Sequence, residues 1–232
     1  SAAFQLLPLW SLALLSTVST VLAFTPMHDA SHKSAAKSKP INEVLGRLMA
    51  LPLAAPFPAF RYLHLEHHKH TNNTKSDPDM WSGTGPRLLL PLRWITQDYY
   101  YYFFYLRSQN RAKLEVLEVV STLVLIYGCA IALAFNGYAT EVFVVWFIPG
   151  RVALGFLAFS FDYLPHHPHT VLSKDDRYQA TVVRESRWLT PLLQYQNYHL
   201  VHHLYPGVPF YRYGRVWWAK RAELIEKGAR VL

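Results

Sequence analysis

The histidines of this chain are the residues whose spacing points most directly to chemistry. All twelve lie in four short clusters, which are HDASH at 28–32, HLEHHKH at 64–70, HHPH at 166–169 and HLVHH at 199–203. Positions i, i+3 and i+4 share one face of an α-helix, so three of these clusters can each direct two or three imidazoles towards one point. The histidines with this spacing are His28, His32, His64, His67, His68, His199, His202 and His203.

Eight converging imidazoles exceed what one metal ion coordinates, but two ions can use about four each and keep positions for water or O2. One HxxxH pair is weak evidence, whereas two HxxHH triplets with an HxxxH pair form a specific metal-binding pattern. Zinc, copper, iron and nickel all accept imidazole, but zinc sites seldom need so many ligands, so a redox-active pair acting with O2 is favoured. His70, His167 and His169 fit no helical face as well, and we expect them not to be ligands.

Four polar residues near these clusters could orient the ligand rings or bind water at the metals. They are Asp77, Asp79, Asp162 and Asn197. For Asp77 and Asp79, a solvated turn around Pro78 is an equally good interpretation. Arg151 stands inside an apolar run, where a charge is unfavourable, so it should pair with a carboxylate, reach a polar cavity, or lie at a helix kink beside Pro149 and Gly150 with its charge extended to the surface. We favour a structural role for it.

The elements that must position these residues include three apolar stretches long enough to span a bilayer, which takes about 20 residues. They are 4–24, 117–135 and 142–161. The last two are separated by a short turn around Gly137 and should form a helical hairpin.

Two further segments should lie near the membrane surface. The stretch 44–60 is apolar but has three prolines, which predicts a broken interfacial or re-entrant segment instead of a full crossing. The stretch 88–107 is dense in tyrosine and phenylalanine, which predicts a helix along the cytoplasmic face.

The basic residues support one topology for these spans. Of 23 Lys and Arg, twelve lie in 25–113 and ten in 162–232, and none lies in the first stretch or in the hairpin turn. The positive-inside rule then places both basic regions in the cytoplasm, which accounts for the net charge of +8 without nucleic acid. This predicts one all-α integral membrane domain over 1–232. Three visible spans carry a cytoplasmic helical cap that holds the metal site, and a fourth span in the full chain would bring its start to the cytoplasm.

The motifs resemble the membrane fatty-acid desaturase and hydroxylase superfamily, whose signature is three histidine boxes in order. HDASH, HLEHH and HLVHH match these boxes, and HTNNTKSDPDMW, FDYLPHHP and QNYHLVHHLYPGVPFYRY resemble a branch with beta-carotene hydroxylases and bacterial acyl-lipid desaturases. The resemblance covers about residues 25–215 and implies a mushroom-shaped helical bundle with a cytoplasmic di-iron centre. It implies that the eight box histidines bind two Fe ions. It also implies a further ligand near the end of the last span, for which FDYLPHHP offers His166.

The function expected from these features is O2-dependent oxidation of a membrane lipid, with a double bond introduced into an acyl chain. Carotenoid ring hydroxylation on the same di-iron scaffold is the close alternative. The chain has one cysteine, Cys129, and no GxGxxG or CxxCH motif, so electrons must come from a donor such as a ferredoxin or a cytochrome b5-type protein.

Two other classes of protein make different predictions. A membrane zinc hydrolase would need an acid/base glutamate, but HExxH is absent and Glu66 is the only nearby candidate. A metal transporter would have ligands at the middle of its spans, whereas these histidines lie at span ends and beyond.

Overall fold

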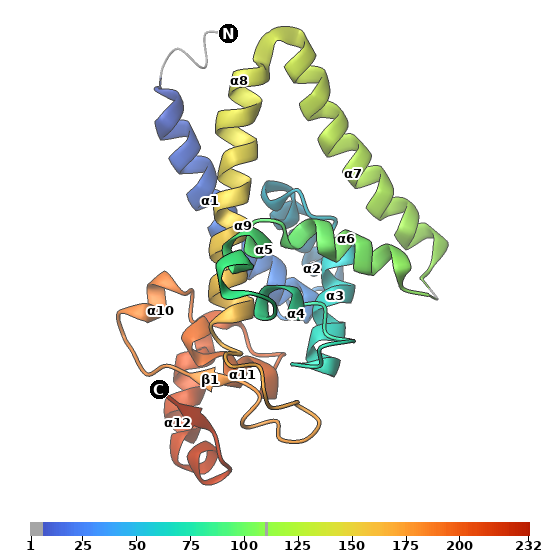
Figure 1. The fold of residues 1–232 in the computed structure, drawn as a ribbon. Helices are drawn as coiled ribbons and strands as arrows, with labels where there is room; N and C mark the ends of the chain where they lie inside the picture. The colour runs from blue at the N-terminus through green and yellow to red at the C-terminus, as the bar shows by residue number, and fades with distance from the viewer. Residues whose placement is uncertain (1–6, 110) are drawn as a thin grey trace.

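Two long apolar helical segments project from one side of a body of shorter helices (Figure 1). The computed structural model describes residues 7–109 and 111–232. The first segment is α1 (Leu9–Ser31), and the second runs continuously from Lys113 to Tyr163. The second segment contains α7 (Lys113–Leu133), η4 (Ala134–Tyr138), α8 (Ala139–Glu141), η5 (Val142–Phe147), α9 (Ile148–Leu157) and η6 (Ala158–Tyr163).

The number of candidate spans differs from the three predicted. By length and hydropathy, the described residues contain two, and the second is 51 residues long. It holds both arms of the predicted hairpin, which turn where Asn136 and Gly137 leave helical geometry and Gly137 takes a φ of 91°. Figure 1 shows the arms as a V that closes at this turn. The hairpin is confirmed, and its two arms are helices joined by a kink at Asn136 and Gly137 within the 51-residue segment.

The first predicted span ends too early. Its residues 4–6 lie outside the described residues, and α1 continues past residue 24 and through Pro26 to Ser31. His28 therefore lies on the candidate spanning helix itself instead of in the segment that follows it, and His32 caps the helix end. In the most apolar 18-residue stretch of each segment, only 17% of α1 and 6% of Lys113–Tyr163 is buried. Most of the apolar side chains in these stretches therefore do not pack against the rest of the protein.

The proline-rich stretch 44–60 is broken, as predicted. It contains the end of α2 (Lys39–Ala50), the turn η2 (Leu51–Leu53) and the start of α3 (Phe57–His70). Ala54 adopts a left-handed conformation between the helices, with φ 51°. The ends of α1, α2 and α3 then pack around a core of Met27, Ala30, Ala50, Phe57 and Phe60. This core fixes the first and second histidine boxes relative to each other.

The stretch 88–107 is not one helix. It forms η3 (Arg87–Leu89), α5 (Leu90–Trp94) and α6 (Gln97–Arg107), which follow α4 (Met80–Gly83). The break at Ile95 and Thr96 turns α6 onto α3, where Tyr105 packs with Ala59 and Leu63. The helix α6 thereby closes one side of the space beside α3.

The C-terminal region carries the third histidine box on a short helix. Its elements are β1 (Val182–Val183), α10 (Leu189–Leu192), η7 (Gln196–Tyr198), α11 (His199–Leu204), η8 (Phe210–Arg212), α12 (Tyr213–Glu226) and β2 (Arg230–Val231). The two strands pair in parallel, which the all-α prediction did not include. A six-residue helix is marginal in isolation. The helix α11 is held because Leu200 and Val201 are fully buried against Tyr213 and Trp217 of α12.

Candidate metal centre

The structure brings together all nine histidines that the sequence predicted as ligands. His28 and His32 come from the end of α1, and the second and third boxes come from α3 and α11. His166 lies in the turn that follows η6 and is 2% exposed. Their ring nitrogens form overlapping groups whose members lie within 4.8 Å of one another. The groups are His28, His32, His64 and His202; His67, His166, His199 and His203; and His68, His202 and His203.

Each triplet box divides between the two groups of four instead of aiming at one point. On α3, His64 belongs to the first group and His67 to the second. On α11, His202 belongs to the first, whereas His199 and His203 belong to the second. His68 lies between the groups, since its Nε2 is 2.7 Å from that of His202 and its ring stacks on His203 at 4.3 Å. The i, i+3, i+4 spacing thus serves two neighbouring positions.

The histidines face one another through a single kind of atom. Six close contacts join Nε2 to Nε2, at separations of 2.7 to 3.3 Å. Two nitrogens that each bind one ion at about 2.1 Å, at right angles, lie roughly 3.0 Å apart. The observed separations therefore fit cis ligands of shared metal ions.

Several outward-facing Nδ1 atoms have polar partners that fix the ring tautomer. His199 Nδ1 lies 2.6 Å from Gln196 Oε1, and His67 Nδ1 lies 2.9 Å from Asp77 Oδ1. Because both oxygens accept, each Nδ1 carries a hydrogen, and the neutral His199 ring keeps the lone pair of its Nε2 for a cation. His202 Nδ1 contacts the Tyr213 hydroxyl at 2.9 Å.

The sequence prediction missed Gln196 and Tyr213. Gln196 stands three residues before the third box, and Tyr213 is the last residue of the YRY run after it. Their proximity to the box was the only signal available, since the contacts depend on how η7 and α12 pack against α11.

Burial keeps most of these rings neutral. It lowers the pKa of His64, His68, His166, His199, His202 and His203 well below the usual range, and neighbouring histidines lower it further. The same causes lower the pKa of His32 to about 3. Neutral imidazole is the form that binds metals.

Among the clustered histidines with a shifted pKa, His67 is the one whose pKa is raised. Burial alone would lower its pKa, but the charges of Asp77 and Asp79 raise it to about 9. Its Nδ1 lies 2.9 Å from Asp77 and 3.2 Å from Asp79. These two carboxylates favour a positive charge at this ring, so they also favour a cation bound at its Nε2.

The four polar residues predicted around the ligands have different surroundings. Asp77 and Asp79 contact His67, in agreement with the interpretation that they orient a histidine ring. Asp162 instead accepts a hydrogen bond from Gln97, at 3.3 Å. Asn197 donates to the Arg184 and Ser186 carbonyls and the Thr190 hydroxyl, so the contacts described for it hold a loop rather than a ring.

Other residues considered from the sequence lie outside the two groups of four. The groups do not include His70, His167 or His169. Arg151 makes two hydrogen bonds to Asp98, at 2.8 and 2.6 Å, which matches the predicted pairing with a carboxylate.

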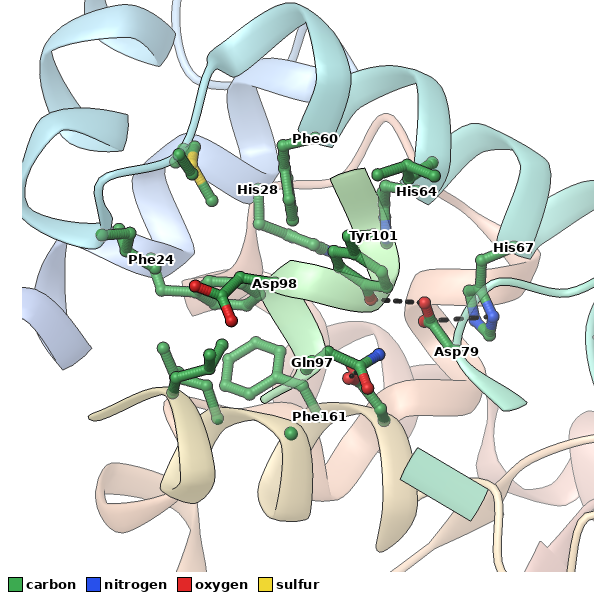
Figure 2. A pocket seen from close by; sticks show the side chains of 18 of the residues that line it. Phe24, His28, Phe60, His64, His67, Asp79, Gln97, Asp98, Tyr101 and Phe161 are labelled. Atoms are coloured by element: carbon green, nitrogen blue, oxygen red, sulfur yellow. Dashed lines mark hydrogen bonds and ion pairs between the residues drawn. The ribbon is translucent and has the colours of Figure 1, made fainter. Parts of the chain in front are cut away.

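An apolar cavity opens beside the histidines (Figure 2). Its empty space, including the solvent at its open mouth, is about 810 Å³. Phe24, Phe60 and Phe161 form part of its wall, and the ring centroids of Phe24 and Phe161 are 4.4 Å apart. His28 and His64 of the first group and His67 and His199 of the second also line it.

This geometry defines a class of helical proteins in which a histidine-lined, metal-compatible site lies beside an apolar cavity. The chain belongs to the fatty acid desaturase family, whose model it matches over residues 4–231.

Its relatives include both acyl-lipid and carotenoid enzymes. It is 27% identical to an sn-1 oleoyl-lipid 12-desaturase of Picosynechococcus, over 90% of this chain and 67% of that protein. It is 31% identical to a beta-carotene ketolase of Paracoccus, over 93% and 81%. It is 26% identical to a chloroplastic omega-6 fatty acid desaturase of Spinacia oleracea, over 79% and 47%. The chain thus spans about half to two thirds of the acyl-lipid desaturases it matches.

We predict that Asp77→Asn weakens metal binding about 10- to 100-fold, the usual effect of losing a partner behind a ligand histidine. The substitution removes the charge that faces His67 Nδ1 while it preserves the shape of the side chain. Competition with a chelator measures the affinity. Glu66→Gln, on the same helix as His67, is the matched control, since Glu66 contacts Lys69 and His70. Equal affinities for the wild type and Asp77→Asn would contradict the role of Asp77.

The metal-free protein should lose stability as the pH falls from 7 to 5. Eight histidines, His32 and His169 among them, have a lowered pKa in the folded state, so below about 6.5 the unfolded chain binds more protons than the folded one at these groups. His67 and Asp79 act in the opposite sense, because the pKa of His67 is raised to about 9 and burial raises the pKa of Asp79 to about 6. The eight histidines outweigh these two groups. Thermal unfolding of the chelated protein tests this, and greater stability at pH 5 would contradict it.

Proposed function

We propose that this protein is a membrane-embedded oxidoreductase that uses two iron ions and O2 to introduce a double bond into a lipid acyl chain. The observation that carries the proposal is that His28 and His64 of one group and His67 and His199 of the other line the same apolar cavity. A hydrocarbon chain in that cavity would lie against both metal positions. Acyl-lipid desaturase relatives support the same reaction.

Iron is the proposed metal because the donors are imidazoles and the activity named for the relatives is an oxidation. When bound, an iron pair supplies the oxidising equivalents from O2 that an unactivated C–H bond requires. The nine histidines fix the positions of the two ions, and Asp77, Gln196 and Tyr213 fix ring orientation from behind.

The cavity wall is proposed to select the carbon that reacts. Phe24 packs edge-to-face on both Phe60 and Phe161, at 5.6 and 4.4 Å between ring centroids. Phe60 in turn stacks on His64 at 5.6 Å. These rings exclude water and restrict where an acyl chain can lie relative to the metal positions, and such positioning contributes strongly to reaction rates.

The membrane is the proposed location, with the metal centre on the cytoplasmic side. The long uncovered apolar surfaces of α1 and Lys113–Tyr163 support insertion, since soluble monomers rarely expose patches of that size. The concentration of basic residues in 25–113 and 162–232 supports the cytoplasmic side. We propose that a ferredoxin or cytochrome b5-type donor binds this basic side and delivers electrons.

Oxidation of a carotenoid ring is the second candidate. The beta-carotene ketolase of Paracoccus shares 31% identity and is covered over 81% of its length, a larger share than the desaturases. Ring hydroxylation, the alternative that the sequence left open, and ring ketone formation differ in the product but need the same apolar cavity and metal pair. A zinc hydrolase has less support, because Glu66 contacts Lys69 and His70.

The test is expression in a host that contains both acyl lipids and beta-carotene, followed by mass analysis of the lipid pool. Desaturation removes two hydrogens from an acyl lipid, ring hydroxylation adds one oxygen, and ketone formation replaces two hydrogens with one oxygen. We expect the first product. His202→Ala should abolish it, since His202 belongs to the first group and also to the group with His68.

Metal analysis of the same purified protein completes the test. Two irons per chain in the wild type, and fewer in His202→Ala, are expected. A protein that holds zinc and hydrolyses lipid esters, or one that changes neither lipid pool while it retains two irons, would contradict the proposal.

A further inference from the structure

Gln97 and Asp162 form a polar pair in the otherwise largely apolar wall of the cavity. Gln97 is 1% exposed, and its Nε2 donates to Asp162 Oδ2 at 3.3 Å. Both side chains line the cavity. Figure 2 shows Gln97 between Asp98 and Asp79, on the side of the cavity that leads towards His67.

The carbonyl oxygen of the Gln97 amide is free to accept a hydrogen bond. A carboxylate oxygen accepts hydrogen bonds, so the amide nitrogen must face Asp162 and the carbonyl oxygen must face another direction. That oxygen, Oε1, is buried and has no hydrogen-bond partner among the residues the structure describes. A buried acceptor without a partner is unfavourable, and such atoms in native proteins usually have a ligand or water partner.

Asp162 differs from Asp98, which lines the same cavity. Arg151 binds both carboxylate oxygens of Asp98, at 2.8 and 2.6 Å. Over residues 7–109 and 111–232, the contact found for Asp162 is the Gln97 amide, and no ion pair forms. One carboxylate oxygen of Asp162 is therefore available to a molecule in the cavity.

We propose that Gln97 and Asp162 bind a hydroxyl group of the lipid substrate. A hydroxyl can donate its hydrogen either to Gln97 Oε1 or to the available oxygen of the Asp162 carboxylate. Gln97 and Asp162 line the same cavity as His28, His64, His67 and His199, so the hydroxyl would share that cavity with the reacting carbon. This inference rests on the proposed function and specifies its substrate class as a lipid with a hydroxyl that lies in the same cavity as the oxidised position.

The experiment measures lipid binding to the full chain in lipid nanodiscs, with and without metal. The probes are two matched pairs, an octadecenoyl glycerolipid with and without a mid-chain hydroxyl, and beta-carotene with and without a ring hydroxyl. Each pair competes at equal concentration, and mass spectrometry quantifies the bound lipid. We expect the wild type to enrich the hydroxyl form of one pair roughly tenfold, as expected for one added hydrogen bond.

Gln97→Met and Asp162→Asn each change one of the two proposed partners of the hydroxyl. Gln97→Met should bring the enrichment close to unity, and Asp162→Asn should reduce it. Tyr102→Phe is the matched control, because Tyr102 lines the same cavity but donates its hydroxyl hydrogen to the Ala54 carbonyl at 3.0 Å, and the enrichment should persist. Thermal unfolding of each variant identifies any that fails to fold.

Two outcomes would overturn the inference. One is a wild type that binds both members of each pair equally. The other is enrichment that survives in folded Gln97→Met, which would mean that water occupies the polar pair and the hydroxyl binds elsewhere. Failure of the proposed function looks different, because binding is read without turnover. Enrichment of a lipid that the iron-loaded protein never oxidises would retain the hydroxyl site and contradict the reaction.

Discussion

The structure depends on one electrostatic constraint, which is that nine imidazole rings converge in a largely buried space. Their Nε2 atoms approach one another to 2.7–3.3 Å. The Nδ1 atoms of His67 and His199 are fixed as donors to Asp77 and Gln196. Lone pairs at such distances repel one another unless a proton or a cation lies between them. Burial disfavours protons, so the proposed metal ions would satisfy most of these nitrogens at once.

Three small cores hold the ligands in place. The first joins α1, α2 and α3, the second joins α3 to α6 and α7, and the third holds α11 against α12. The third matters most for the ligands, because α11 has only six residues and could not persist without Trp217 and Tyr213 beneath it. Tyr213 also contacts His202 Nδ1, so one residue supports both the helix and a ligand. The apolar cavity forms between the first two cores and α9, where its wall meets the histidines.

The set of histidines that come together could be predicted from sequence because helical spacing is local. The clusters on α1, α3 and α11 fix which rings share a face, and the FDYLPHHP resemblance supplied His166. The division of each box between two groups could not be predicted, because it depends on the angles at which the helices meet. The end of the first span was predicted too early because hydropathy falls at HDASH. The helix nevertheless continues to Ser31. The Gln97–Asp162 pair joins segments 65 residues apart, so no local pattern reveals it.

The most direct test of this account is anomalous diffraction from crystals of the purified, iron-loaded protein, recorded on both sides of the iron absorption edge. The account predicts two iron peaks, one among His28, His32, His64 and His202 and the other among His67, His166, His199 and His203. A single peak, or a peak bound by His67 with Asp77 and Asp79, would contradict it.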